Sequence, residues 1–137
     1  MDGDEVRTIV ITGGSDGLGK TLTETFTKEN NVIILAKNEE KMKIVAKENN
    51  CSYKVCDISN YEEVEIAIGE IIEKYNKIDV LINNAGLWIQ EELDTNNSDR
   101  IKSVIEVNLL GTINASKAVI PFMKEYKDGL MAIQTKN

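Results

Sequence analysis

The chain has 137 residues, of which 42% are hydrophobic and 28% charged, which is enough for one hydrophobic core and too little for two full domains. Its 23 acidic residues outnumber 16 basic ones, and the net charge of −7 argues against nucleic acid and anionic membranes as partners. The chain has no histidine, so His-based catalytic triads and zinc sites with His ligands are excluded, and we expect no metal site.

Apolar runs of strand length alternate along the chain with segments of helical period. Strands are predicted at residues 8–12, 32–35, 53–56, 80–82 and 130–134. Helices are predicted at 18–26, at 38–49, around the apolar stripe of residues 64–72, and at 99–127, with a surface loop at 87–98. Leu18, Leu22 and Phe26 should form the apolar face of the first helix, and Pro121 should bend the last one.

This alternation predicts an α/β fold, a Rossmann-like doubly wound parallel sheet with strand order 3-2-1-4-5, in a single domain spanning residues 1–137. Cys51 and Cys56 are five residues apart in an extended segment, so they should point to opposite faces and stay reduced. The N-terminus is acidic and no apolar run approaches about 18 residues, so we expect no signal peptide, no membrane span and a cytoplasmic protein.

A glycine-rich loop, TGGSDGLG at residues 12–19, links the first strand to the first helix. Backbone N–H groups and the positive end of the helix dipole at such a position bind a pyrophosphate. Gly13 would allow the tight turn, Gly17 the close approach of phosphate, and Gly19 the packing of helix on strand. The loop alone leaves open a plain strand-to-helix turn with positive φ at Gly13 and Gly17.

Three further motifs follow in order, and together the four resemble those of the short-chain dehydrogenase/reductase family. The family's Thr-Gly-x-x-x-Gly-x-Gly motif is matched at residues 12–19, its Asn-Asn-Ala-Gly motif at 83–86, its Asp after the third strand at Asp57, and its asparagine segment at Asn108. The resemblance covers residues 6 to 135. It implies an NAD(P)-dependent oxidoreductase of which this chain is the N-terminal cofactor-binding portion, truncated after the fifth strand.

The resemblance also implies a set of cofactor contacts. Asp57 would accept a hydrogen bond from the adenine amino group, with Ile58 beside the base, and the backbone of residues 84–86 would line the adenosine ribose. Asn83 has a competing structural role, as a buried amide that ties neighbouring strands together. The implied cofactor-binding residues are Gly13, Ser15, Asp16, Gly17, Leu18, Gly19, Lys37, Asp57, Ile58, Asn84, Ala85 and Gly86.

The end of the second strand is where the family distinguishes NADP from NAD. An acidic residue there accepts from the ribose 2′-hydroxyl, whereas a basic residue pairs with a 2′-phosphate. Ala36 and Lys37 supply a cation and no acid, which favours NADP, with NAD as the alternative. Two observations weigh against this. Asp16 stands where one variant of the family carries a basic residue, and the alternative for Lys37 is an exposed residue at a helix start.

In the resembled family Ser, Tyr and Lys assist hydride transfer to a carbonyl, and an Asn positions the Lys through water. Asn108 matches this asparagine, its structural alternative being an amide bonded to its own helix. The serine is expected near residues 134–137, and none of the four tyrosines has a lysine four residues later. We therefore expect no carbonyl reduction by this chain alone. It would be part of a reductase, a non-catalytic dinucleotide-binding or interaction module, or half of a split enzyme.

The long helix and the fifth strand predict association with another chain. The helix carries two apolar stripes, Ile101, Val104, Ile105 and Leu109 in one and Val107, Leu110, Ala118 and Phe122 in the other. The family's covering elements, the helix that bears Tyr and Lys and two further strands, are not found in residues 1–137. We expect a homo-oligomer or a complementing chain to cover this surface.

Overall fold

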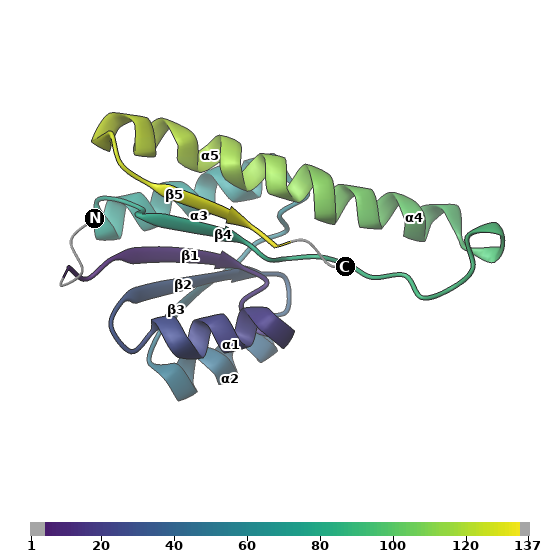
Figure 1. Ribbon diagram of the computed structural model, residues 1–137, viewed down its shortest axis with the longest axis horizontal. Helices are drawn as coiled ribbons and strands as arrows, with labels where there is room; N and C mark the ends of the chain where they lie inside the picture. The colour runs from purple at the N-terminus through teal and green to yellow at the C-terminus, as the bar shows by residue number, and fades with distance from the viewer. Residues whose placement is uncertain (1–4, 135–137) are drawn as a thin grey trace.

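The computed structural model describes residues 5–134 and shows strands alternating with helices along the chain (Figure 1). The strands are β1 (Thr8–Thr12), β2 (Asn31–Ala36), β3 (Ser52–Val55), β4 (Val80–Asn83) and β5 (Leu130–Ile133). The helices are α1 (Gly17–Phe26), α2 (Glu39–Asn49), α3 (Tyr61–Tyr75), α4 (Ser98–Ile105) and α5 (Gly111–Tyr126). A short 3₁₀ turn, Leu93–Thr95, interrupts the loop before α4. The order and type of the predicted elements are confirmed.

The five strands form one parallel sheet in the order β3-β2-β1-β4-β5, which confirms the doubly wound α/β fold. Thr12 at the carboxyl end of β1 lies opposite Asn83 at the carboxyl end of β4. From β1 the chain moves outward to β2 and β3, whereas β4 leads outward to β5 on the other side. The fold therefore has its topological switch point between β1 and β4, where ligands of open α/β sheets bind.

Helices α1 and α2 cover one face of the sheet, and α3 and α5 cover the other (Figure 1). Alternate residues of β1 serve the two layers: Ile9 and Ile11 pack towards α1, and Val10 packs in the core under α3 and α5. Cys51 packs on the α1 and α2 side and Cys56 on the other, and both thiols are free. The expectation that the two cysteines face opposite sides and stay unpaired is confirmed.

The apolar face predicted for α1 is wrong at its first residue. Leu22 and Phe26 pack on the sheet, but Leu18 is exposed, because α1 begins at Gly17 and its first turn lies beyond the end of β1. The buried residues of this helix are Gly19 and Thr23, and the Thr23 hydroxyl is within hydrogen-bond distance of the carbonyls of Gly14 and Gly19, at 2.9 Å each. A polar side chain therefore ties α1 to the glycine loop.

The predicted long helix is present, but it is not a regular α-helix throughout. A π-helical segment, Glu106–Leu110, joins α4 to α5, so the main irregularity lies there, and α5 continues through Pro121. The rod extends well beyond the sheet at its α4 end (Figure 1). Ile105, Leu109 and Leu110 are exposed on it. The second predicted apolar stripe is mostly not an exposed surface, because Ala118 is buried and Val107 and Phe122 pack against the core under α3 and α5. Across residues 5–134, no helix combines the length and apolar character needed to cross a membrane.

Candidate functional site

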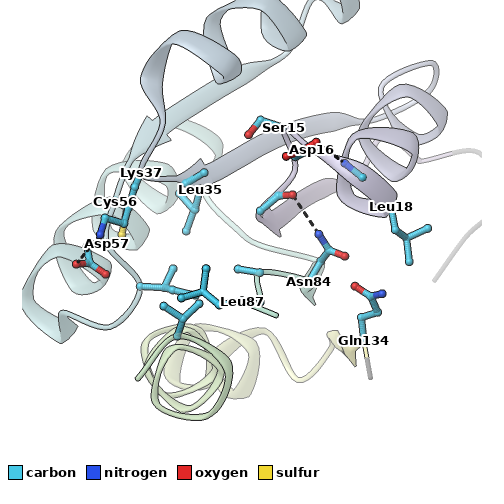
Figure 2. Close-up of a pocket in the computed structure, with 17 residues that line it drawn as sticks. Ser15, Asp16, Leu18, Leu35, Lys37, Cys56, Asp57, Asn84, Leu87 and Gln134 are labelled. Atoms are coloured by element: carbon cyan, nitrogen blue, oxygen red, sulfur yellow. Dashed lines mark hydrogen bonds and ion pairs between the residues drawn. The ribbon is translucent and has the colours of Figure 1, made fainter. Parts of the chain in front are cut away.

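A cleft of about 460 Å³ lies at the carboxyl ends of β1, β2 and β4 (Figure 2). It contains every predicted cofactor-binding residue except Gly19, which lies behind the loop. The cleft is lined by Gly13, Ser15, Asp16, Gly17, Leu18, Leu35, Ala36, Lys37, Cys56, Asp57, Ile58, Asn84, Ala85, Gly86, Leu87, Val107 and Gln134. The fold therefore brings the separate sequence motifs to one place.

The glycine loop turns sharply out of β1 because two of its glycines adopt left-handed backbone. Gly13 has φ +68° and Gly17 has φ +50°, a region that side chains with a Cβ rarely occupy. The N–H of Gly13 donates to the carbonyl of Leu35 at 2.8 Å, so the loop starts anchored to β2. Gly19 packs so tightly against Gly13 that an added Cβ would clash with the Gly13 carbonyl oxygen. The tight turn at Gly13 and the close packing at Gly19 have the expected geometry, and the role of Gly17 towards a phosphate stays a prediction.

The loop after β4 is tied to the glycine loop by side chains. The Thr12 hydroxyl accepts the N–H groups of Asn84 and Ala85, both at 3.1 Å. In return, Nδ2 of Asn84 donates to the Gly13 carbonyl at 3.1 Å, the bond drawn in Figure 2. The side chain of Asn84 thus ties the loop after β4 to the glycine loop, and Asn84 also lines the cleft.

The space beside Gly17 fits an anionic group. α1 begins at Gly17, so the positive end of its dipole faces the cleft. A Cβ on Gly17 would meet nothing within 4 Å, unlike one on Gly13 or Gly19. Open space at a helix N-terminus that lines the cleft leaves room for the pyrophosphate of a dinucleotide. Asp16 caps the helix, its carboxylate accepting the Gly17 N–H at 3.0 Å.

Lys37 and Asp57 lie side by side at one end of the cleft (Figure 2). Nζ of Lys37 is 3.7 Å from Oδ2 of Asp57. Oδ1 of Asp57 accepts the Ser59 hydroxyl at 2.6 Å and the Ser59 N–H at 3.0 Å. The hydroxyl bond is the main cause that lowers the pKa of Asp57, with the Ser59 N–H and Lys37 contributing, so this carboxylate is ionised at neutral pH.

Ile58 and Asn83 are both buried, but only Ile58 lines the cleft. Ile58 forms part of the cleft wall and packs beneath Gly111, where an added Cβ would clash with it. Asn83 was expected to tie neighbouring strands together. Its side chain instead donates to the Ser116 hydroxyl at 3.2 Å, so it ties β4 to α5. Cys56 also lines the cleft, and burial raises its pKa to about 11, so its thiol is neutral at physiological pH.

The structural alternative for Asn108 was an amide that bonds to its own helix. The side chain of Asn108 bonds instead to the loop after β4. Its Oδ1 accepts the N–H of Leu87 at 2.7 Å, and its Nδ2 donates to the Leu87 carbonyl at 3.0 Å. Both polar groups of the side chain therefore clamp the loop after β4, and Asn108 lies in the middle of the π-helical segment. π-turns of this kind are frequent at functional sites.

Sequence reasoning missed one charged side chain near the cleft. Lys41, in the first turn of α2, places Nζ 3.1 Å from Oδ2 of Asp16. This ion pair and the Gly17 N–H lower the pKa of Asp16. The available signal was Asn38, a helix N-cap residue that puts Lys41 one turn beyond Lys37. Nothing local indicated its partner, which lies 25 residues away.

Part of the expected catalytic region lies outside the described residues. The serine was expected near residues 134–137, of which only Gln134 is described, and it lines the cleft. Among residues 5–134, no three His, Cys, Asp or Glu side chains are placed to hold a metal ion.

Comparison with known proteins gives one consistent result. The family model described as short chain dehydrogenase matches residues 7–133. An uncharacterized oxidoreductase of Staphylococcus saprophyticus is 31% identical over 133 residues, which cover 94% of this chain and 54% of that protein. The chain spans about half the length of the curated relatives that it matches.

Two solved structures share the fold. An alcohol dehydrogenase from the archaeon Thermococcus sibiricus, complexed with 5-hydroxy-NADP, superposes with a TM-score of 0.84 and 26% identity, over 94% of this chain and 57% of that one. A metagenomic short-chain oxidoreductase in complex with NADP has a TM-score of 0.85 and 25% identity, over 93% and 61% of the two chains.

Proposed function

The chain belongs to the short-chain dehydrogenase family, and from that premise we propose that its cleft binds a nicotinamide dinucleotide, NADP in preference to NAD. The glycine loop and the α1 N-terminus would hold the pyrophosphate, Asp57 and Ile58 the adenine, and the backbone of residues 84–86 the ribose. The observation that carries the proposal is the open space beside Gly17, at positive φ and at the start of α1.

Titration of the chain with NADP and NAD, followed by calorimetry, tests the proposal. Gly17→Asn is the variant of choice, since asparagine adopts the left-handed region more readily than most residues and its side chain would occupy the open space. We expect saturable binding by the unmodified chain and loss of binding in the variant, with similar unfolding temperatures. The absence of binding by the unmodified chain, or unchanged binding by the variant, contradicts the proposal.

The preference for NADP is supported by the residues at the end of β2. Lys37 lies there with its side chain 72% exposed, free to reorient, and no acidic residue occupies its own or the preceding position. Two structural neighbours were solved with NADP or a derivative of it. Lys37→Asp should reverse the preference towards NAD, since a carboxylate repels a 2′-phosphate and accepts from a free hydroxyl. Equal affinities for both cofactors in the unmodified chain would argue against this role.

The activity of the whole protein follows from the same proposal. A bound nicotinamide supplies or accepts a hydride, and the family's Ser, Tyr and Lys would come from residues not present in this chain. Asn108, the one catalytic position of the family found here, would position the loop at Leu87 beside the cleft. We propose that the chain is the cofactor-binding portion of an oxidoreductase that acts on a carbonyl or alcohol, and that it is inactive alone.

Association with another chain, another copy or a complementing one, forms part of the proposal. Ile105, Leu109 and Ile113 are exposed at four-residue spacing on the long helix, and Leu130 and Ile133 are exposed on β5. Leu109→Lys should shift the protein towards monomers at tens of micromolar. Ile66→Lys, at an equally exposed site on α3, is the control. A stable monomer of the unmodified chain contradicts the idea. The two free cysteines suit the proposed cytoplasmic location.

A further inference from the structure

Two lysine–aspartate pairs include residues that line the cleft. One joins Lys37 to Asp57, and the other joins Lys41 to Asp16. Asp16 belongs to the cleft lining, and Figure 2 shows it apart from Asp57, on the glycine loop. Asp16 is fixed there because the same carboxylate group caps α1. Lys41 is therefore drawn from α2 towards the glycine loop.

The backbone of α2 sets where Lys41 starts. Asn38 caps the helix and accepts the N–H of Lys41 at 3.1 Å, which places Lys41 one turn after Lys37, in the helix that follows the carboxyl end of β2. This end of the second strand is where folds of this type hold the adenosine ribose. Lys37 and Lys41 thus both lie on the segment that follows β2, and each is paired with an aspartate of the cleft lining.

The neighbouring lysines do not share this arrangement. Lys43 pairs with Glu39 at 3.6 Å, within α2, and Lys20 pairs with Glu24 at 3.9 Å, within α1. Both are exposed i, i+4 pairs on helix surfaces. The pair formed by Lys41 is different because it crosses from α2 to a residue of the cleft lining.

We propose that Lys41 is a second specificity-determining residue, which exchanges the carboxylate of Asp16 for the 2′-phosphate of NADP. This inference rests on the proposed function of the cleft. A phosphate monoester carries a charge of about −1.5 to −2 at neutral pH and three acceptor oxygens, so it competes with a single carboxylate for an ammonium group. The ribose hydroxyl of NAD is neutral and cannot draw Lys41 away. Lys41 therefore contributes to NADP binding and leaves NAD binding unchanged.

The position of Asp16 explains why the second lysine matters. Its carboxylate stands beside the phosphate region and would repel a 2′-phosphate, and in the free cleft Lys41 balances that charge. The side chain of Lys41 is 54% exposed, so it can turn from Asp16 without breaking packing. Its helix-capping bond is made by the backbone N–H, so replacing the side chain leaves α2 intact.

The test compares dissociation constants for NADP and NAD in the unmodified chain, Lys41→Gln and the matched control Lys43→Gln. Removing one charge about 4 Å from a phosphate in an exposed site should weaken NADP binding about five- to tenfold. The dissociation constant for NAD should change less than about twofold in Lys41→Gln. Lys43→Gln should leave the dissociation constants for both cofactors unchanged. An unmodified chain that binds neither dinucleotide contradicts the proposed function. If Lys41→Gln weakens the binding of both cofactors equally, or of neither, the role of Lys41 is contradicted while the proposed function of the cleft stands.

A second comparison distinguishes direct contact between Lys41 and the 2′-phosphate from neutralisation of the Asp16 carboxylate by Lys41. Asp16→Asn keeps an N-cap side chain for α1 and removes the carboxylate charge. If Lys41 contacts the phosphate, Lys41→Gln still weakens NADP binding when it is introduced into Asp16→Asn. If the loss disappears in that background, Lys41 serves only to neutralise Asp16, and the proposal is overturned.

Discussion

Replacing Gly19 by alanine should loosen the contact between α1 and the loop that precedes it. A Cβ on Gly19 would lie closer than 3.0 Å to the carbonyl oxygen of Gly13 and to Nδ2 of Asn84. Both are held in place, because Nδ2 of Asn84 donates to that carbonyl. The methyl group must therefore push α1 away from the loop or separate the two bonded groups.

The cost can be estimated from these two effects. Forcing an extra methyl into a packed site costs about 1–3 kcal/mol, and weakening the bond between Asn84 and Gly13 adds about 1 kcal/mol. We expect Gly19→Ala to lower the free energy of unfolding by about 2–4 kcal/mol, a large part of the total of about 5–15 kcal/mol that is typical of a domain. With a urea m-value of about 2 kcal/mol/M, in the middle of the usual range, the unfolding midpoint falls by roughly 1–2 M.

The matched control is Gly69→Ala. Gly69 lies inside α3, and a Cβ there would meet nothing within 4 Å. The same substitution should raise stability by about 0.5–1 kcal/mol, since alanine loses less backbone entropy in a helix. Urea unfolding of the three proteins, followed by circular dichroism, compares them directly. If Gly19→Ala is as stable as Gly69→Ala, the tight packing between loop and helix is refuted.

Asn108→Ala should speed hydrogen exchange of the Leu87 amide, which loses its 2.7 Å acceptor, while amides in β1 stay protected; unchanged exchange at Leu87 would contradict the clamp. Asp57→Asn should make the free energy of unfolding fall less steeply as the pH is lowered below about 4. The lowered pKa of Asp57 means that its contribution is present above about pH 4, the ordinary pKa of an unfolded aspartate, and is lost as pH falls through the folded value, so an asparagine should leave a smaller slope in acid unfolding. The chain alone should not oxidise NADPH with a ketone, since the general acid is worth about 10²–10⁴-fold; steady turnover abolished by Gly17→Asn would show otherwise.

The strands were predictable because burial on both faces leaves a simple pattern in the sequence. β1 and β2 lie at the centre of the sheet and read as unbroken runs of β-branched and aliphatic residues. β3 lies at the edge and is only partly buried, and its alternation suggested that position. The glycine loop was equally clear, because Gly13 and Gly17 need conformations that other residues avoid.

The π-helical segment could not be read from the sequence. Residues 106–110 contain no glycine or proline that would mark an irregular turn. The bond partner of Asn108 is the backbone of Leu87, 21 residues away, so a local pattern carries no trace of the clamp. For Leu18, by contrast, a local pattern was present but misleading. Its spacing matched an apolar stripe, but the helix start at Gly17 put it over the cleft rather than the sheet.

The two lysine–aspartate pairs show why cofactor preference cannot be predicted from single motif positions. It depends on which charged side chains the fold brings together. At position 16 the aspartate, taken alone, argues against a phosphate, and at position 37 the lysine argues for one. The fold adds Lys41 beside Asp16 and pairs Lys37 with Asp57, so the free cleft holds two balanced pairs rather than one misplaced acid. A dianionic phosphate would have to displace both carboxylates from their lysines. The proposed preference for NADP should therefore weaken as salt rises, because exposed charges are screened over about 8–10 Å at physiological ionic strength.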